Sequence, residues 1–362
     1  MKFFNERAFR WVLIICIIGY SICMISCTST PKIRSGIAEI RSITIGSIKQ
    51  TILIRGENLG NPILLYLHGG PGSTEMIPFR LAHKNLEKYF TVVSWEQRGT
   101  GRSFSDDISP DSMTIDQFVS DTHELTGYLL KEFGKSKIVL AGHSWGTILG
   151  MLTVSTYPND YYAYVGSGQE VNPAEGEKIG YEYVLAKAQN NKKAQDELQK
   201  INIGEPYLTI DPKGEWYNKI KIERKWLVAF GGEIYNKSDY SLLFNAKTLL
   251  APEYSFIDFI KFGRGSVFSL KTMWPQIMKI NLRELVKKVD VPVFFLQGRN
   301  DYNASTSIFN DYYSILEAPI KAVFYFENSA HHPMYEEPDK YEQILIENVL
   351  PLCMQEDPVV AY

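Results

Sequence analysis

The segment KIVLAGHSWGTILGMLTVSTYP, residues 137–158, decides the fold of this chain. It opens with IVLA, a short apolar run rich in branched side chains, which is typical of a strand buried on both faces. After the serine, apolar residues recur at helical spacing, and the pattern stops before Pro158. The sequence therefore predicts a strand, a sharp turn and a helix around Ser144, which lies between Gly142 and Gly146.

The same alternation of strand and helix continues on both sides of this segment. Further strands are expected at 42–56, 63–67, 90–95, 161–168, 291–298 and 322–326, and further helices start near 114, 304 and 338. The helix near 114 has a capping-box pair in Thr114 and Gln117, and Gly134 closes it. Strands that alternate with helices form a parallel sheet with helices on both faces. The predicted fold class is therefore α/β, with a mostly parallel, doubly wound sheet.

Residues 169–273 interrupt this alternation. This part contains charged helical pieces, aromatic patches and the glycine pair of AFGGEIY, and we interpret it as an inserted, mainly helical cap. The expected core then comes in two parts, 37–168 and 274–362. In front of it lie a membrane segment at 1–27 and a polar tether at 28–36.

Composition limits the possible functions of the chain. With 362 residues, of which 45% are apolar, it can bury a full hydrophobic core, so a disordered chain is excluded. The formal charge is -3 and no Lys/Arg cluster is visible, so no positive electrostatic field is expected that would attract a phosphate backbone. This argues against a nucleic-acid partner. Three of the four cysteines lie within the first 27 residues, so no disulfide framework is expected.

The first 27 residues have the features of an export signal. Basic residues precede an uncharged apolar run from Trp11 to Ser26. As a helix this run spans about 24 Å, less than the ~30 Å hydrocarbon core of a bilayer. It ends in MISC, which resembles the lipobox of bacterial lipoproteins and makes Cys27 the expected lipidation site. We therefore expect an exported, membrane-anchored lipoprotein; an uncleaved single-span anchor and a buried hydrophobic helix are the alternatives.

Ser144 acts as a nucleophile only if the chain also supplies exposure, a base and donors for the oxyanion. In Gly-x-Ser-x-Gly the glycines let a tight strand-to-helix turn lift the hydroxyl outward; the alternative is a plain tight turn. Asp301 follows an apolar strand, so it lies where a doubly wound sheet exposes its functional loops. His331 and His332 follow the next strand in the same way, and one of them is the expected base.

The order serine, acid, histidine along the chain matches the α/β-hydrolase pattern. In that pattern two backbone N–H groups hold the oxyanion: one from the residue after the nucleophile, here Trp145, and one from a loop after an early strand. HGGPG at 68–72 is such a loop. Gly70 has no side chain to obstruct a substrate carbonyl, and Pro71 stiffens the turn, so we expect the N–H of Gly70 to be the second donor.

Five motifs in order resemble the proline iminopeptidase family of α/β-hydrolase serine peptidases. They are HGGPG (68–72), WEQRGTGRS (95–103), GHSWGT (142–147), GRND (298–301) and AHHPMYEEP (330–338). The resemblance implies that His331 is the catalytic histidine and that His332 has no catalytic part. It also implies a structural role for Arg98. No metal-ligand cluster is apparent in the sequence, and a serine mechanism requires no cofactor.

Specificity is expected to depend on the cap. The resemblance implies that acidic cap residues bind the free amino group of the substrate, but the family's usual cap motif of Trp, Ser and Trp-Glu is absent, so it does not imply a preference for proline. Glu233 and Glu182 are the candidates, since a buried carboxylate facing a cleft pairs with an ammonium. The alternative for each is an ordinary surface charge. The aromatic residues of the cap line an apolar pocket or pack in its core.

The resulting hypothesis is a membrane-tethered serine hydrolase, an aminopeptidase that releases N-terminal residues from short peptides through an acyl-enzyme. A carboxylesterase that acts on small acyl esters with the same triad is the alternative among enzymes. A non-catalytic binding lipoprotein is the alternative outside them. The expected partners are a small peptide or ester substrate and a membrane, and the sequence does not indicate the oligomeric state.

Overall fold

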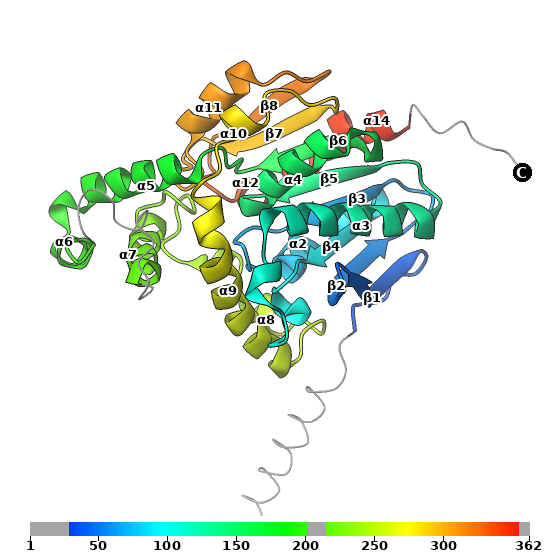
Figure 1. Cartoon of the computed structure of the whole chain (residues 1–362), viewed down its shortest axis with the longest axis horizontal. Helices are drawn as coiled ribbons and strands as arrows, with labels where there is room; N and C mark the ends of the chain where they lie inside the picture. The colour runs from blue at the N-terminus through cyan, green and yellow to red at the C-terminus, as the bar shows by residue number, and fades with distance from the viewer. Residues whose placement is uncertain (1–28, 202–214, 355–362) are drawn as a thin grey trace, which may run out of the picture.

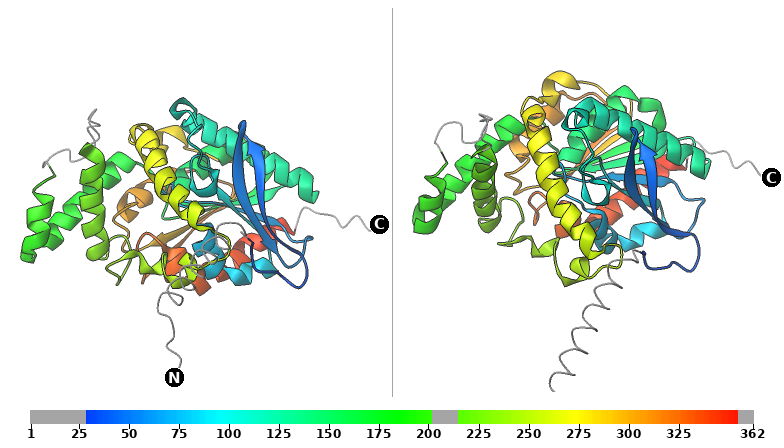
Figure 2. Two further views of the ribbon diagram at one scale, coloured as in Figure 1. Left: turned by 90° about the horizontal axis from the view of Figure 1, so that it is seen from below. Right: turned by 60° about the horizontal axis from the view of Figure 1, so that its bottom comes forward.

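The computed structural model of the chain describes residues 29–201 and 215–354. The expected membrane segment at 1–27, with the candidate lipidation site Cys27, lies outside the described residues. Within the described ranges, no helix is both long enough and apolar enough to cross a membrane. Two further views of the molecule show a central sheet with helices packed around it (Figure 2).

One eight-stranded sheet forms the centre of the molecule (Figure 1). Its strands are β1 Ile37–Ile45, β2 Ile48–Gly56, β3 Ile63–Leu67, β4 Thr91–Glu96, β5 Ile138–His143, β6 Tyr161–Ser167, β7 Val293–Gly298 and β8 Lys321–Phe326. Their spatial order is β1-β2-β4-β3-β5-β6-β7-β8. β2 pairs antiparallel with β1 and β4, and all other neighbouring strands are parallel. The predicted α/β class with a mostly parallel sheet is confirmed.

β3 shows why the sheet is buried on both faces. Its five residues, ILLYL, are all buried. Because side chains alternate along a strand, Ile63, Leu65 and Leu67 belong to one apolar core and Leu64 and Tyr66 to another. The continuous apolar run that predicted this strand therefore reflects apolar packing on both faces of the sheet.

Helices cover both faces, as a doubly wound fold requires. One apolar core includes residues of α3 Ile115–Phe133, α4 Trp145–Thr156, α10 Leu282–Leu285 and α11 Thr306–Ile315. The other includes residues of α2 Met76–Ala82, α12 Pro333–Glu336, α13 Pro338–Ile344 and α14 Leu350–Cys353. The carboxyl ends of β3 to β8 all lie at one edge of the sheet, because these strands are parallel.

The ends of α3 lie where the sequence predicts them. Thr114 Oγ1 accepts a hydrogen bond from Gln117 N at 3.1 Å, and Gly134 closes the helix with a left-handed φ of 62°. The second half of the predicted capping box does not form. The Gln117 side chain points along the helix instead, where its Nε2 donates to Asp121 Oδ1 at 2.7 Å.

Between β6 and β7 the chain leaves the sheet and forms a helical region (Figure 1). Its helices are α5 Pro173–Lys187, α6 Lys192–Leu198, α7 Glu215–Ala229, α8 Ala246–Leu249 and α9 Phe256–Ile277. An apolar cluster of its own, which includes Val184, Leu198 and Leu227, joins α5, α6 and α7. α9 runs through position 273, where the sequence suggested the end of the cap, so one continuous helix crosses that boundary.

The beginning of the described chain lies against the body of the protein. Ser29 N donates to the carbonyl oxygen of Pro252 at 3.2 Å, and Thr30 Oγ1 donates to Glu253 Oε1 at 2.9 Å. Thr30 is 9% exposed. The first described residues of the 28–36 stretch, which we expected to be a tether, are therefore held in place by hydrogen bonds to the link between α8 and α9.

Candidate active site

Ser144 forms the sharp turn between β5 and α4. β5 ends at His143 and α4 begins at Trp145, so the turn consists of this single residue. Its φ of 53° and ψ of -122° are unfavourable for a residue with a side chain. A strained turn at this position carries the serine hydroxyl outward at the end of the sheet, and Ser144 lines the large cavity there.

Gly142 and Gly146 make this turn possible. A Cβ on Gly142 would lie 2.4 Å from the carbonyl oxygen of Gly146, and a Cβ on Gly146 would lie 2.2 Å from the carbonyl oxygen of Leu67 on β3. Both contacts are with backbone atoms, which cannot move aside as a flexible side chain can. Strand, turn and helix therefore pack this closely only when both positions are glycine.

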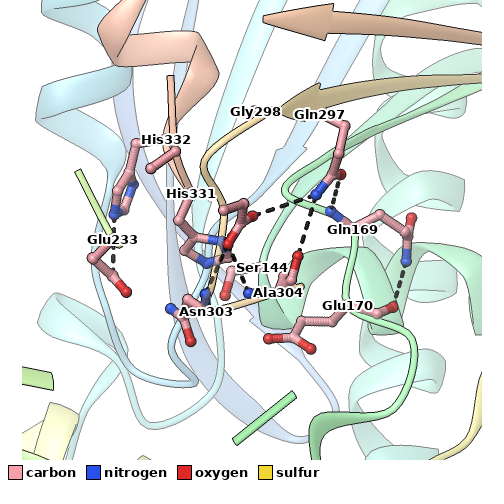
Figure 3. Close-up of polar contacts among 12 residues, drawn as sticks. Ser144, Gln169, Glu170, Glu233, Gln297, Gly298, Asn303, Ala304, His331 and His332 are labelled. Atoms are coloured by element: carbon pink, nitrogen blue, oxygen red, sulfur yellow. Dashed lines mark hydrogen bonds and ion pairs between the residues drawn. The ribbon is translucent and has the colours of Figure 1, made fainter. Parts of the chain in front are cut away.

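Asp301 and His331 come together from the ends of two neighbouring strands. Asp301 follows β7, and His331 follows β8, which pairs parallel with β7. His331 Nδ1 lies 2.9 Å from Asp301 Oδ2. The other carboxylate oxygen accepts hydrogen bonds from the backbone N–H of Asn303 at 2.9 Å and of Ala304 at 2.8 Å (Figure 3). These bonds fix the carboxylate, and the carboxylate in turn fixes the imidazole.

The other ring nitrogen of His331, Nε2, is buried and has no hydrogen-bond partner among the described residues. Ser144 and His331 line the same cavity, and Figure 3 shows them next to each other. Burial alone lowers the pKa of His331, but the charges of Asp301, Glu233 and Glu170 outweigh it and raise the pKa to about 9. With one nitrogen on a carboxylate and the other available beside a serine, this imidazole is arranged for proton transfer.

Gly70 and Trp145, the predicted oxyanion donors, line the cavity together with Ser144. Trp145 is the first residue of α4, so its N–H is one of the unpaired donors at a helix N-terminus. In the HGGPG loop the N–H of Gly69 donates to Glu75 Oε1 at 3.2 Å. The N–H of Gly70 has no partner in the described part of the chain. Of these two N–H groups, that of Gly70 is therefore the one that remains available to a substrate.

Glu233 lies at the site, as the sequence predicted, and contacts both neighbouring histidines. The backbone N–H of His331 donates to the carbonyl oxygen of Glu233 at 3.0 Å, and His332 Nε2 lies 3.3 Å from Glu233 Oε1. Burial lowers the pKa of His332, although its hydrogen bond with Glu233 acts in the opposite direction. Glu233 also lines the cavity. The loop after α7 is thus tied directly to the loop that carries His331.

Glu182, the second predicted cap carboxylate, does not reach the site. It is exposed on α5, whereas Tyr181 and Val184 of the same helix are buried. The inward side of α5 carries Glu177, one turn before Tyr181, and Glu177 lines the cavity. The expectation that Glu182 binds the substrate is corrected for this reason: its position on the helix turns it toward solvent.

Further acidic residues at the cavity were not predicted. Glu170 follows β6 and lines the cavity, and burial raises its pKa to about 8. Arg224 of α7 forms ion pairs with Glu177 and Glu223, and burial raises the pKa of Glu223. Glu170 comes directly after a strand, which is the same signal that identified Asp301, so the sequence contained the information to find it.

A buried polar chain lies behind the nucleophile and was also not predicted. His143 Nδ1 lies 2.9 Å from Glu75 Oε1, and His143 Nε2 lies 2.9 Å from the carbonyl oxygen of His331. The hydroxyls of Tyr66 and Tyr335 also donate to Glu75. Burial alone raises the pKa of Glu75, but His143 and Tyr66 bring it down to about 2. Only the fold brings Glu75 to this place, because the residue stands in no recognisable motif.

The cavity in front of Ser144 has a volume of about 330 Å³, a size typical of small-molecule sites. α9 and α7 each line it with one face. The lining residues are Phe262, Ser266, Leu270, Trp274 and Ile277 of α9, and Tyr217, Ile220, Lys221 and Arg224 of α7. Across the described ranges, no group of three or more His, Cys, Asp and Glu side chains is placed to hold a metal ion.

Comparison with known proteins agrees with this geometry. The model of a family described as the alpha/beta hydrolase fold matches residues 62–189. The probable aminopeptidase YbaC of Bacillus subtilis is 37% identical over 314 residues, which cover 86% of this chain and 96% of that protein. A proline iminopeptidase of Heyndrickxia coagulans is 23% identical over 293 residues, 80% of this chain and 91% of that protein.

Among solved structures, a proline iminopeptidase-related protein from Thermus thermophilus has a TM-score of 0.60 at 17% identity, covering 88% of this chain and 99% of that chain. At this identity the likeness bears on the fold alone. The extended match to the Bacillus subtilis protein bears on the family, because it spans nearly the whole of both chains. We conclude that the chain is a hydrolase of the α/β-hydrolase family and belongs to its proline iminopeptidase-like members.

Proposed function

We propose that the protein is a serine aminopeptidase that releases an N-terminal residue from short peptides through an acyl-enzyme. Ser144 Oγ attacks the carbonyl carbon of the first peptide bond, His331 Nε2 takes the hydroxyl proton, and Asp301 stabilises the imidazolium. When the tetrahedral intermediate collapses, the C–N bond breaks and the leaving amine takes the proton from His331. Water, deprotonated by His331, then attacks the ester and releases the residue.

The oxyanion is held by the backbone N–H groups of Trp145 and Gly70. Both residues line the cavity beside Ser144. Each donor belongs to a fixed element, since one is the first residue of α4 and the other lies in the loop after β3. Donors that are in place before the reaction need no rearrangement as negative charge develops on the carbonyl oxygen.

The observation that carries the aminopeptidase assignment is the state of Glu233. Its Oε2 is buried and has no hydrogen-bond partner among the described residues. Burial alone raises the pKa of this carboxyl, but the hydrogen bond with His332 and the charges of His331 and His332 bring it down to about 2. An ionised carboxylate that is buried with one oxygen unpaired favours a cationic occupant.

The α-ammonium of a peptide is such a cation, and it stands one carbon away from the carbonyl that Ser144 attacks. We therefore assign Glu233 to the ammonium. Glu170, which also lines the cavity, is the second carboxylate in position to contact it. The ion pairs of Arg224 are formed with Glu177 and Glu223, and its charge also lowers the pKa of Glu233 and of Glu170.

The test compares substrates with and without an amine in Glu233→Gln, which keeps the side-chain shape and removes the charge. We expect kcat/KM for aminoacyl naphthylamides, prolyl-naphthylamide included, to fall roughly 10- to 150-fold, the value of one charge-assisted hydrogen bond. Turnover of p-nitrophenyl acetate is expected not to fall, because loss of the Glu233 charge lowers the pKa of His331 and leaves more of this base neutral. Glu182→Gln, on the exposed side of α5, is the matched control. An equal loss on both substrates contradicts the ammonium role.

A carboxylesterase is the second candidate. It is favoured by the apolar side chains that α9 presents to the cavity, Phe262, Leu270 and Trp274 among them. The same assay separates the two: an esterase turns over the acetate ester far better than any aminoacyl substrate, and Glu233→Gln causes no selective loss on aminoacyl substrates.

Ser144→Ala tests the nucleophile in either case. We expect kcat to fall roughly 10⁴- to 10⁶-fold and covalent labelling by a fluorophosphonate to be lost. Full activity in this variant would exclude the mechanism. Absence of labelling in the unmodified protein would favour a non-catalytic binding protein.

We also propose that residues 1–27 attach the exported protein to a membrane, with Cys27 as the lipidated residue. The support is the basic start, the uncharged apolar run and the MISC sequence before Thr28. Globomycin and Cys27→Ala are expected to block processing. Unchanged processing together with membrane retention would contradict lipidation and favour an uncleaved anchor.

A further inference from the structure

A group of exposed apolar side chains lies on α8 and the first turns of α9. These residues, which we call the α8–α9 patch, are Leu249, Leu250, Phe256, Ile257 and Ile260, with exposed fractions of 50%, 70%, 64%, 45% and 48%. Single exposed apolar residues are common on protein surfaces, but a group of large ones marks an interaction surface. Figure 1 shows α8 and the start of α9 at one end of the molecule, away from the edge strand β8.

The patch is held rigidly from behind. Ala251 and Tyr254, in the link between the two helices, are buried and pack with Met76 and Ile77 of α2. Ser255 begins α9 with a complete capping box that includes Asp258. The apolar side chains are thus exposed because the inward positions of this segment are already filled, and not because the segment is loosely placed.

The described chain starts beside this patch. Ser29 N donates to the carbonyl oxygen of Pro252, and Thr30 Oγ1 donates to Glu253, two residues of the link between α8 and α9. Cys27 is two residues before Ser29, and two extended residues reach no further than about 7 Å. Whatever holds Cys27 therefore lies close to the patch.

We infer that the α8–α9 patch lies on the lipid bilayer to which residues 1–27 are attached. The inference rests on the membrane attachment proposed above. Apolar side chains at one end of a rigid body insert at the boundary between headgroups and acyl chains, and the exposed Lys247 of α8 suits anionic headgroups beside them. Because the patch is already rigid before it meets the bilayer, its insertion costs little conformational entropy.

α9 connects the patch to the cavity. Phe262 and Ser266 of α9 line the cavity. Phe244, which packs on Phe262 with ring centroids 5.8 Å apart, lines it too and is 37% exposed, so it stands at the rim. Phe244 therefore packs on α9, the helix whose first turns carry the patch.

The experiment places an environment-sensitive fluorophore on the full chain in vesicles of phosphatidylethanolamine and phosphatidylglycerol. Ile257→Cys carries the probe in the patch. Leu285→Cys, at an equally exposed apolar residue of α10, is the matched control, and the unsubstituted chain gives the background from native cysteines. Turnover of p-nitrophenyl acetate confirms that each variant is folded. We expect the probe at 257 to shift to shorter emission wavelengths and to be quenched by lipid-borne quenchers, and the probe at 285 to do neither.

Flotation of the same samples with the vesicles separates the two proposals. A chain that floats while the probe at 257 behaves like that at 285 overturns the docking surface and leaves the attachment intact. A chain that does not float contradicts the attachment and, with it, the docking. If the probe at 257 is shielded from water in the absence of lipid, the docking on a bilayer is overturned as well. A doubled molecular mass then shows that a second copy of the chain covers the patch, and a monomeric mass shows that residues 1–28 cover it.

Discussion

His143 Nε2 lies 2.9 Å from the carbonyl oxygen of His331, so the residue before the nucleophile holds the backbone of the proposed base. The other nitrogen of His143 lies 2.9 Å from Glu75 Oε1. Glu75 in turn accepts from the N–H of Gly69, next to the proposed oxyanion donor Gly70. One buried side chain pair thus connects the loops that carry the nucleophile, the base and the oxyanion donor. We expect it to act by positioning, since neither residue is needed for a proton-transfer step.

Replacement of His143 tests this connection. We expect His143→Ala to lower kcat roughly 10- to 100-fold with little change in KM, because a small displacement of the base costs rate more than binding. His143→Gln, whose amide can still donate, is expected to restore part of the loss. His123→Ala, at a partly exposed histidine of α3, is the control. A variant His143→Ala with unaltered kcat would remove the residue from the positioning network.

The pH dependence of ester hydrolysis reports the protonation of His331. The base accepts the serine proton only when it is neutral, and its pKa is raised to about 9, so kcat/KM is expected to rise with pH until that value is passed. An ester without an amine keeps the titration of the substrate out of the profile.

Glu170→Gln is expected to move the midpoint of this profile to lower pH. The pKa of Glu170 is about 8, so the carboxylate is ionised in the range where His331 titrates and favours the imidazolium there. Removing that charge lowers the pKa of His331, and activity appears earlier on the pH scale. Glu182→Gln should leave the midpoint in place. A midpoint that stays put or moves upward in Glu170→Gln would show that the two groups are not coupled.

Gly146→Ala is expected to disrupt the serine turn. The added Cβ would lie 2.2 Å from the carbonyl oxygen of Leu67, so we expect fluorophosphonate labelling to be lost and the free energy of unfolding to fall by roughly 1–3 kcal/mol or more. Gly127→Ala, in α3 with no atom near the added Cβ, is the control and should be neutral or stabilising by up to about 1 kcal/mol. Labelling that survives in Gly146→Ala would contradict the close packing of α4 on β3.

Arg98 is expected to matter for stability. It forms a buried bidentate pair with Asp121 at 2.9 and 3.0 Å and also donates to the carbonyl oxygen of Gly46. Arg98→Ala leaves a buried carboxylate unpaired, so the free energy of unfolding should fall by roughly 3–5 kcal/mol. Arg264→Ala, which removes an exposed pair with Asp106, should cost less than about 1 kcal/mol. Urea titration measures both, and equal effects would argue against the structural role.

The three residues of the predicted triad all lie at strand ends. Ser144, Asp301 and His331 each follow an apolar run that is recognisable without the structure, and parallel strands bring their ends to one edge. The ends of α3 were predictable for a similar reason, because Thr114 and Gly134 have local chemistry that needs no tertiary contact.

Apart from Glu170, the parts that were missed depend on packing. Glu177 and Glu182 stand on the same helix, whose sequence is polar on several sides, so only the contacts of α5 decide which of them faces the cavity. Glu75 acquires its role from Tyr66, Tyr335 and His143, three residues brought to it by the fold. The missing half of the capping box has the same origin, since the Gln117 side chain is directed to Asp121, to which it donates.

β6 and β7 are direct neighbours in the sheet, with Tyr164 opposite Val293, although the whole helical region lies between them in the chain. Because the two strands are parallel, the chain leaves the sheet at the carboxyl end of β6 and returns at the first residue of β7, at the opposite edge. Insertions, deletions or replacement of that region need not alter the register of the sheet that carries Ser144, Asp301 and His331. Over evolution, substrate specificity can thus diverge while Ser144, Asp301 and His331 keep their places. The two ends of the helical region are also places where a foreign cap can be grafted.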